Sequence, residues 1–388
     1  MEINANEFLK HAIRTAEHFG FRSGTAWRGR KECVDCKVSL THTAKAEERR
    51  QDGNFGLLAD GINAYTSSKL HAIEEPVFYY SIEQVPRTGE MAIVFQIFGV
   101  EKSIAEAVLI QTLRSLLFAV GLKDHTIRIN SLGDRDSQVR YQRELTSFFR
   151  KRLEDMPPTA RELLKESATS TLLHLMEKGH DLAYKSPSPM EYLSDGSRRH
   201  FREIVEYLDM SNTPYEIDPK LIGHYNCYHD AIFSLDLTDS NGLPVNDQPL
   251  SIRGGRYGNF FEKHLNKNVP AVGAVLVLQG KKAPARIPRP RVKNPSVYLI
   301  HLGFAPKIRS LLLLDELSKS DIIIDQNLAS DSLSNQLRRA EEKGARYTII
   351  LGQKEYVDRS VILRDMIGKS QETVPFEGLL SRLKKMHS

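Results

Sequence analysis

The sequence has little cysteine and no long apolar run. Its 388 residues include only three cysteines, too few for a disulfide framework, which favours a reducing cytoplasm as the location. No apolar stretch approaches the roughly 18 residues that a membrane-spanning helix needs, so we expect no membrane partner. The first residues, Met1 to Asn4, lack the basic and then apolar layout of an export signal. A cytoplasmic protein is therefore expected.

The composition is that of a folded protein. Hydrophobic residues make up 40% of the chain and charged residues 27%, which excludes wholesale disorder. The length suffices for two or three domains, each with a sizeable core. A formal net charge of +5 permits binding to nucleic acid but does not by itself argue for it.

Two local patterns mark the start of the chain. Apolar residues recur at helical spacing from Phe8 to Phe19, with Asn6 placed to cap this helix and Gly20 to end it. Within residues 76–98, two apolar runs flank a Pro-Arg-Thr-Gly turn. This pattern predicts an antiparallel hairpin.

The rest of the chain alternates between helical and strand-like patterns. An amphipathic helix is predicted over residues 104–120, and mostly helical patterns over 140–217 indicate an insertion within a β-rich domain. Residues 281–295 hold four prolines and six Lys or Arg, which indicates an extended, solvated linker. Beyond it, strands and helices alternate over residues 296–388. That alternation predicts a largely parallel sheet covered by helices.

Several collinear segments resemble one family. The stretch QNLASDSLSNQLRRAEEKGARYTIILGQKE, followed by VILRDM, is similar to the C-terminal anticodon-binding domain of histidyl-tRNA synthetase. Other segments follow the order of the same synthetase, namely FQIFGVEKSIAEAVLI, IRINSLGD, RRHFREIVEYLD, GGRYGNF and PAVGA. The resemblance runs from about Pro76 to the C-terminus. It is a specific signal because long segments match in the right order.

The resemblance implies an α+β class II aminoacyl-tRNA synthetase core, an antiparallel sheet with helices, which is normally dimeric. Residues 1–139 and 218–280 would form this core, and residues 140–217 the helical insertion. Residues 281–295 would be the basic, proline-rich linker, and residues 296–388 the α/β anticodon-binding domain. The implied partners are a second copy of the chain and tRNA. No further protein partner can be named.

The implied chemistry is ATP-dependent activation of histidine, which requires positive charge around a triphosphate. Arginine suits this task because its planar fork grips phosphate oxygens at two points. The family places such arginines at three points. In the hairpin of this chain only Arg87 remains. Gly223 stands where the family has an arginine before a Gly-Leu-Asp-Tyr-Tyr run, and Gln279 and Gly280 replace a Glu-Arg pair, with Lys281 one residue further on.

Other family positions are kept. Glu101 matches a residue that holds the substrate amino group, so Arg87, Glu101 and Lys281 are the residual catalytic candidates. The expected pocket contains Glu101, His224, Cys227, Tyr228, Gly254, Gly255, Arg256 and Tyr257. The lost arginines predict a non-aminoacylating relative, a pseudoenzyme that acts as a tRNA-binding or regulatory homodimer. The alternative is an active histidine–tRNA ligase with a rearranged site, which would use ATP and Mg²⁺.

Three polar residues cluster at the expected pocket: His224, Cys227 and His229. They indicate either a changed ligand pocket or a metal site, or else polar residues that their neighbours satisfy. A nucleophilic Cys–His pair is disfavoured because the sequence offers no carboxylate that evidently orients the histidine.

Zinc is a further hypothesis. Cys33 and Cys36 have the spacing of half a zinc site, with His42 close behind. A structural zinc needs four ligands and there is no second cysteine pair, so an unmetallated pair of thiols is the alternative.

Four cations on a predicted helix and its exit are candidates for tRNA binding: Arg338, Arg339, Lys343 and Arg346. Lys and Arg are the side chains that meet phosphates in RNA complexes. The alternative is a solvated helix face, because Glu341 and Glu342 offset much of the charge.

Overall fold

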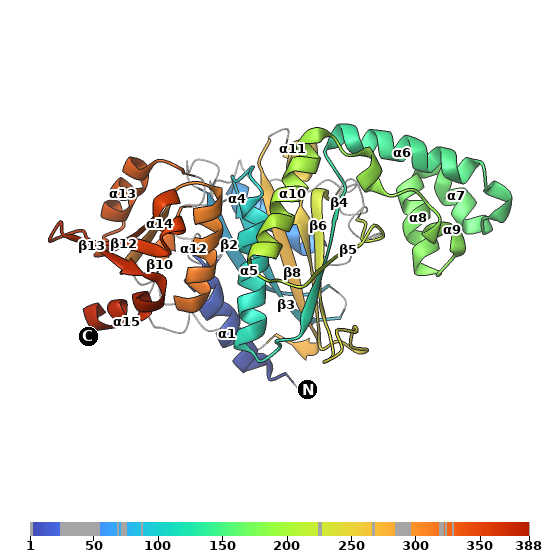
Figure 1. Ribbon diagram of the computed structural model, residues 1–388. Coiled ribbons are helices and arrows are strands. Elements are labelled where there is room, and N and C mark those ends of the chain that lie inside the picture. The colour runs from blue at the N-terminus through green and yellow to red at the C-terminus, as the bar shows by residue number, and fades with distance from the viewer. Residues whose placement is uncertain are drawn as a thin grey trace.

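The computed structural model describes residues 3–23, 55–67, 70, 76–86, 88–223, 227–265, 268–283, 296–317, 322, 324–327 and 330–387. Two sheets organise these residues, one of eight strands and one of five. Figure 1 shows the large sheet in the middle, the small sheet with its helices on one side, and a group of outlying helices on the other. Within these ranges, no helix has the length and apolar character needed to cross a bilayer.

The chain begins with helix α1 (Ala5–His18), whose apolar residues turn inward as predicted. The predicted cap is wrong by two residues. Asn4, not Asn6, caps the helix, because its side chain accepts from the backbone N–H groups of Asn6 and Glu7 at 3.0 and 3.3 Å. Gly20 ends the helix region with φ +87°, a conformation that glycine adopts without strain.

The predicted hairpin is confirmed as strands β2 (Val77–Gln84) and β3 (Glu90–Phe98), which pair antiparallel. The large sheet has the order β1-β2-β3-β8-β7-β6-β4-β5. Its other strands are β1 (Arg22–Ser23), β4 (His125–Ser131), β5 (Tyr215–Ile217), β6 (His229–Leu237), β7 (Leu250–Arg256) and β8 (Ala271–Lys282). All neighbours pair antiparallel except β1 with β2 and β4 with β5.

Alternate side chains of these strands enter two different cores. Phe78, Tyr80 and Ile93 pack on one face with α1, α5 (Ile104–Ala119) and α10 (Asp195–Met210). Tyr79 and Val94 pack on the other face with α4 (Phe55–Ser67) and α11 (Gly258–Leu265). This period of two follows from the pleat, and it explains why both faces of the hairpin are apolar in sequence.

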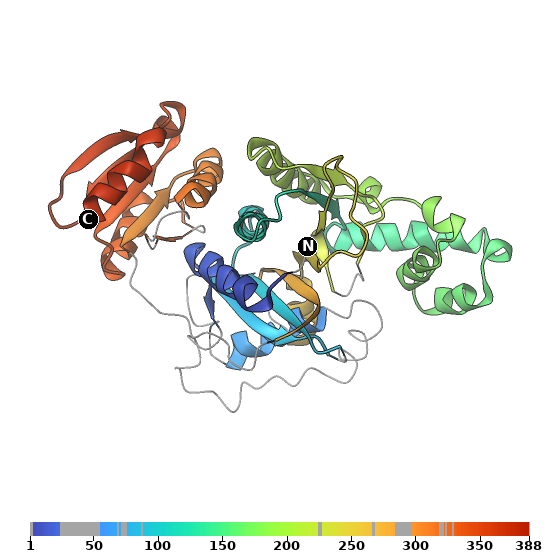
Figure 2. The same cartoon turned by 90° about the horizontal axis from the view of Figure 1, so that it is seen from below.

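A group of helices projects from one end of the large sheet (Figures 1 and 2). It contains α6 (Arg135–Arg150), η3 (Leu153–Asp155), α7 (Pro158–Glu166), α8 (Ala168–Glu177), α9 (Asp181–Tyr184) and η4 (Pro189–Tyr192). The later part of the range 140–217 lies with the sheet instead. Helix α10 packs on α5 and β6, and β5 pairs with β4.

The C-terminal sheet has the order β10-β9-β11-β12-β13. Its elements are β9 (Val297–His301), α12 (Phe304–Leu317), β10 (Ile324–Gln326), α13 (Leu333–Glu342), β11 (Tyr347–Leu351), α14 (Gln353–Val357), β12 (Ser360–Asp365), β13 (Gln371–Pro375) and α15 (Phe376–His387). Only β10, β9 and β11 run parallel, so the prediction of a largely parallel sheet is wrong for its second half. The connections after β11 and β12 are too short for a parallel crossover, which needs about a dozen residues.

The two sheets are docked through α1, α5 and α12. Nε2 of His18 lies 2.6 Å from the carbonyl oxygen of Leu314, so its N–H donates across the junction. Burial lowers the pKa of His18, which keeps the ring neutral. Ser115 of α5 donates to the carboxylate of Asp315, and Arg22 lies 3.5 Å from Asp325. One apolar core runs through both sides of this junction.

Candidate functional site

The predicted pocket residues meet where β6, β7 and β8 begin or end. Cys227 and Tyr228 come directly before β6, and Tyr257 directly follows β7. All three side chains are buried, and Cys227 is a free thiol. His224 lies outside the described residues. Tyr228 contacts Gly255, because a Cβ atom added to that glycine would lie 2.9 Å from its ring.

The glycines of this region lie against neighbouring atoms. A Cβ atom on Gly254 would lie 2.6 Å from the carbonyl oxygen of Gly273, and one on Gly273 would lie 2.7 Å from Leu58 of α4. Contacts under 3.0 Å do not fit, so glycine is required at both positions for packing. The backbone that would form a pocket floor is therefore covered by side chains.

Gly223 stands at the position of a family arginine, and its surroundings leave no space for a side chain. A Cβ atom there would lie 2.7 Å from the ring of Tyr228 and 3.0 Å from Ile232. Both neighbours are buried in the same apolar core. An arginine at this position would require Tyr228 to move.

The second altered position lies inside β8. This strand continues to Lys282 and pairs with both β3 and β7. Gly280 has φ +67°, and its N–H donates to the carboxylate of Glu90 at 2.8 Å. Gln279 and Gly280, which replace the family's Glu-Arg pair, therefore lie within β8. Lys281 is half-buried in this strand, and Arg87 lies outside the described residues.

Glu101 and Glu106 differ sharply in burial. Glu101 lies in the connection between β3 and α5 with its side chain exposed, and its charge acts on the buried Arg256. Glu106 of α5 is fully buried and binds Arg256 through two contacts of 2.7 Å. His200 of α10 lies 3.0 Å from the same carboxylate. The buried acid of this region is therefore one that the sequence did not single out.

The charge of Glu106 is offset by Arg256 and His200. Burial alone would raise the pKa of Glu106, but Arg256 and His200 outweigh it and lower the pKa to about 2. The pKa of His200 is raised, because the attraction of Glu106 exceeds the effect of burial. Arg256 also donates to the carbonyl oxygens of Val100 and Lys102 at 3.0 and 3.2 Å. Its guanidinium is thus used by the protein and is not available for a phosphate.

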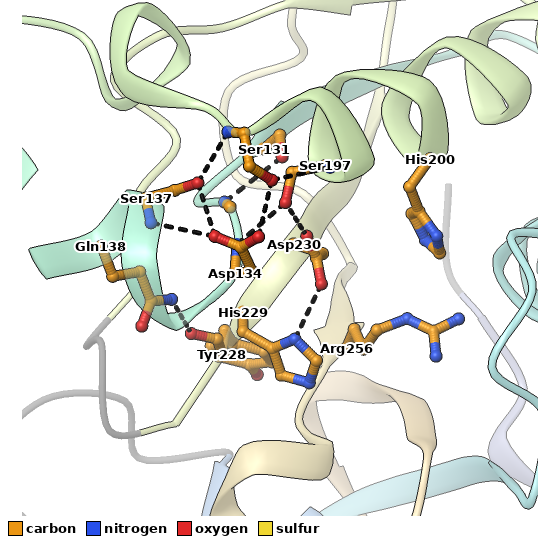
Figure 3. Close-up of polar contacts among 12 residues, drawn as sticks. Ser131, Asp134, Ser137, Gln138, Ser197, His200, Tyr228, His229, Asp230 and Arg256 are labelled. Carbon is orange, nitrogen blue, oxygen red and sulfur yellow. Dashed lines mark hydrogen bonds and ion pairs between the residues drawn. The ribbon is translucent and has the colours of Figure 1, made fainter. Parts of the chain in front are cut away.

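A second polar network surrounds Asp230, at the start of β6 (Figure 3). Nδ1–H of His229 donates to the Asp230 carboxylate at 2.9 Å, and the hydroxyl of Ser197 donates to its other oxygen at 2.6 Å. Asp230 has φ +48°, which is uncommon for a residue with a side chain, beside a bulge in the pairing of β6 with β7. Burial raises the pKa of Asp230, but His229 outweighs it and lowers the pKa to about 2.

The geometry leaves one imidazole nitrogen unused. Nε2 of His229 is buried and has no hydrogen-bond partner among the described residues. A histidine that is oriented by a carboxylate in this way can act as a base or accept a hydrogen bond. The sequence analysis disfavours a nucleophilic Cys–His pair because it finds no orienting carboxylate, although Asp230 is the residue after His229. Neighbouring side chains of a regular strand point to opposite faces, and only the unusual φ of Asp230 brings the two together.

The predicted RNA-binding cations lie on α13 and its exit. Arg338 pairs with Glu342 one turn away, and both side chains are exposed. Nζ of Lys343 lies 2.7 Å from Asp325, so this lysine supports the sheet. Arg346 is exposed and lies 4.0 Å from a carboxylate oxygen of Asp365. Arg339 is half-buried.

The predicted zinc ligands Cys33, Cys36 and His42 lie outside the described residues. Within the part of the chain that the structure describes, no group of three His, Cys, Asp or Glu residues could hold a metal ion.

Comparisons with known proteins give similarities to the same kind of protein in a family model and in curated sequences. The family model of the anticodon binding domain matches residues 307–386. The histidine–tRNA ligase of Geobacillus sp. (strain WCH70) is 26% identical over 318 residues, which cover 80% of this chain and 74% of that protein. The histidine–tRNA ligase of Thermosynechococcus vestitus is 25% identical over 375 residues, covering 91% and 84%. A crystal structure of apo S. aureus histidyl-tRNA synthetase aligns over 97% of this chain and 94% of its own, with 17% identity and a TM-score of 0.48.

An antiparallel core with helices on both faces, followed by an anticodon-binding domain, defines the class II aminoacyl-tRNA synthetase fold. Relatives that match along most of both chains narrow the class to one family. Along most of its length the chain is therefore similar to histidine–tRNA ligases, from which it has diverged widely in sequence.

Proposed function

We propose that this protein is a histidyl-tRNA synthetase-like pseudoenzyme of the cytoplasm that does not activate histidine but binds tRNA as a regulatory homodimer. The observation that carries the proposal is the packing at Gly223. Tyr228 and Ile232 fill the space that an arginine side chain would need. The loss at this position is therefore built into the core.

The energetic consequence of such losses is large. Removing one preorganised donor from a reacting centre costs about 2.7–4 kcal/mol of transition-state stabilisation, and about 1.4 kcal/mol is tenfold in rate. The hairpin and the end of β8 are two further positions where the family has arginines and this chain has other residues. The buried Arg256 does not substitute, because Glu106 neutralises it.

The tRNA-binding part of the proposal rests on the C-terminal domain. Residues 307–386 match the anticodon binding domain, and Arg338 and Arg346 are exposed on it. The homodimer is included because cores of this family are normally dimeric.

ATP–pyrophosphate exchange with purified protein and histidine tests the catalytic part. We expect no histidine-dependent exchange, while the histidine–tRNA ligase of Geobacillus sp. serves as the positive control. Robust exchange would favour the alternative, an active ligase in which Arg87 and Lys281 serve the triphosphate with Mg²⁺.

Gel shifts with total tRNA over a range of salt concentrations test the binding part. Binding should weaken steeply with salt, because phosphate contacts release counterions. Salt-insensitive binding, or none at low salt, would contradict it. Sedimentation equilibrium decides whether the protein is a dimer.

A further inference from the structure

Three donors converge on one carboxylate at the end of the parallel strands of the C-terminal sheet. Asp331, between β10 and α13, lies 2.6 Å from Nζ of Lys307 and 3.0 Å from Nζ of Lys102. The backbone N–H of Gly303 donates to it at 3.2 Å. Gly303 directly follows the β9 region, and the carboxyl ends of parallel strands are the usual ligand side of an α/β sheet.

The charges at this point favour an anion. Two ammonium groups face one carboxylate, and the N-terminus of α12 adds the positive end of its dipole. Burial raises the pKa of Asp331, but Lys307 and Lys102 outweigh it and lower the pKa to about 2. The side chain of Lys307 is only 4% exposed, whereas Lys102 is 65% exposed and Asp331 42%. Solvent therefore reaches the carboxylate and Lys102, while Lys307 forms the base of the site.

Behind the lysines, some buried polar atoms have no hydrogen-bond partner among the described residues. His301, the last residue of β9, is fully buried, and neither ring nitrogen has a hydrogen-bond partner among the described residues. Burial and then Lys307 lower the pKa of His301 to about 3, so the ring is neutral. Oε1 of the buried Gln336 also lacks a partner within the described ranges. Buried polar groups of this kind are usually completed by ordered water or a bound polar molecule.

We propose that Lys102, Lys307 and the Gly303 amide form a phosphate site, which Asp331 occupies in the free protein and an RNA phosphate occupies in the complex. Carboxylate and phosphate oxygens accept the same charge-assisted hydrogen bonds, so one can replace the other. The inference rests on the proposed RNA-binding function and assigns a specific contact to it.

The surroundings favour RNA over a free anion. Phe304, the first residue of α12, is 37% exposed, and Leu333, the first residue of α13, is 40% exposed. An exposed aromatic ring beside a phosphate site suits the stacking of an unpaired base. Helix α13 leads from this point to Arg338, an exposed cation that pairs with Glu342.

The site also gives the catalytic core a role without catalysis. Lys102 belongs to the core, and Arg256 holds its backbone carbonyl in place at 3.2 Å. Arg256 is in turn fixed by Glu106. The buried ion pair of the core therefore positions a lysine that completes the phosphate site on the other domain.

Replacing the occupying carboxylate tests the inference. Asp331→Asn in the full-length protein should bind total tRNA more tightly, by about three- to tenfold at 0.1 M salt, because the amide no longer competes for the lysines. Glu377→Gln is the matched control. It removes a carboxylate from an exposed ion pair with Arg359 in the same domain and raises the net charge equally. The control should gain less than about twofold.

A second pair of variants guards against a general charge effect or a folding defect. Lys102→Gln changes an exposed side chain, and it should weaken tRNA binding and flatten the slope of log affinity against log salt by about 0.7–0.9. The double variant Asp331→Asn/Lys102→Gln should lose most of the increase in tRNA affinity that Asp331→Asn alone produces. If Asp331→Asn binds no better than Glu377→Gln, or if the gain survives without Lys102, the inference is wrong.

Inorganic phosphate separates this inference from the proposed function. Phosphate should raise the melting temperature of Asp331→Asn more than that of the wild type or Glu377→Gln. If no variant binds tRNA, the proposed function fails, and the phosphate response alone decides whether the site exists. An equal response in all three proteins would overturn the site.

Discussion

The interior of the core and its junction with the C-terminal domain hold ion pairs of opposite kinds. In the core, Glu106 and Arg256 are both buried, and each satisfies the other. At the end of the C-terminal sheet, Asp331 and Lys102 remain in reach of solvent. Separating a buried ion pair leaves an uncompensated charge in the interior, so such a pair does not readily exchange partners. An exposed pair contributes little to stability and can exchange them. On the proposed function, the buried pair belongs to a scaffold and the exposed pair to the surface that contacts tRNA.

The largest expected effect comes from breaking the buried pair. Glu106→Gln leaves Arg256 without its counter-ion and should lower the free energy of unfolding by about 3–5 kcal/mol in urea titrations. Glu162→Gln, which breaks an exposed pair with Lys165, should change it by less than about 1 kcal/mol. A similar small effect for both variants would remove the contrast between buried and exposed pairs.

At acid pH, most of the difference in free energy of unfolding between the wild type and Glu106→Gln should disappear. The pKa of Glu106 is lowered to about 2 from an ordinary 4.5, so its contribution is present above 4.5 and is lost as the pH falls towards 2. The raised pKa of His200 has the opposite sign, so its contribution is present below 6.5 and is lost as the pH rises through the folded value. Urea unfolding from pH 2 to 9 measures both limbs. If the free energies of unfolding of the two proteins differ by the same amount at every pH, the pKa shifts assigned to Glu106 and His200 are wrong.

The packing at Gly223 should produce a smaller loss. Gly223→Ala places a methyl group 2.7 Å from Tyr228, and overpacking of this kind costs about 1–3 kcal/mol. Gly196→Ala is the matched control, because its Cβ atom would meet only Ser194, at 3.7 Å. Thermal unfolding of both variants measures the difference. If Gly223→Ala is as stable as Gly196→Ala, the space at Gly223 is open and the argument against an arginine there weakens.

The smallest effect on stability is expected on α13. Arg338→Gln breaks an exposed pair and should change the free energy of unfolding by less than about 1 kcal/mol. The same change should weaken tRNA binding a few-fold and flatten its salt dependence, because one phosphate contact is lost. Arg359→Gln, which also removes an exposed arginine from an ion pair, is the control for charge alone. Equal losses of tRNA affinity in the two variants would show that α13 is not a specific contact.

Local patterns in the sequence predicted the hairpin, the helix α5 and the order of segments, because these features depend on the spacing of apolar residues along the chain. The sequence predicts more parallel strands in the C-terminal sheet than the structure has. The alternation of strands and helices does not reveal that the connections after β11 are short. Pairs that join distant residues, such as Glu106 with Arg256, leave no local pattern.

The site shows the same limit. His229 was singled out but its partner was missed, because the contact depends on the backbone conformation of Asp230. The resemblance points to Glu101, no sequence pattern points to Glu106, and their difference in burial is seen only in three dimensions. The proposed phosphate site combines Lys102 with Asp331, 229 residues further along the chain, and no sequence pattern reveals that contact.

The proposal that the core no longer activates histidine is tested most directly by a crystal structure of the protein grown with ATP, Mg²⁺ and histidine. We predict that Tyr228 and Ile232 stay packed over Gly223 and that no triphosphate is ordered beside β7 and β8. Ordered phosphates held by Arg87, Lys281 or another basic side chain, next to a bound histidine, would contradict the loss of activation chemistry.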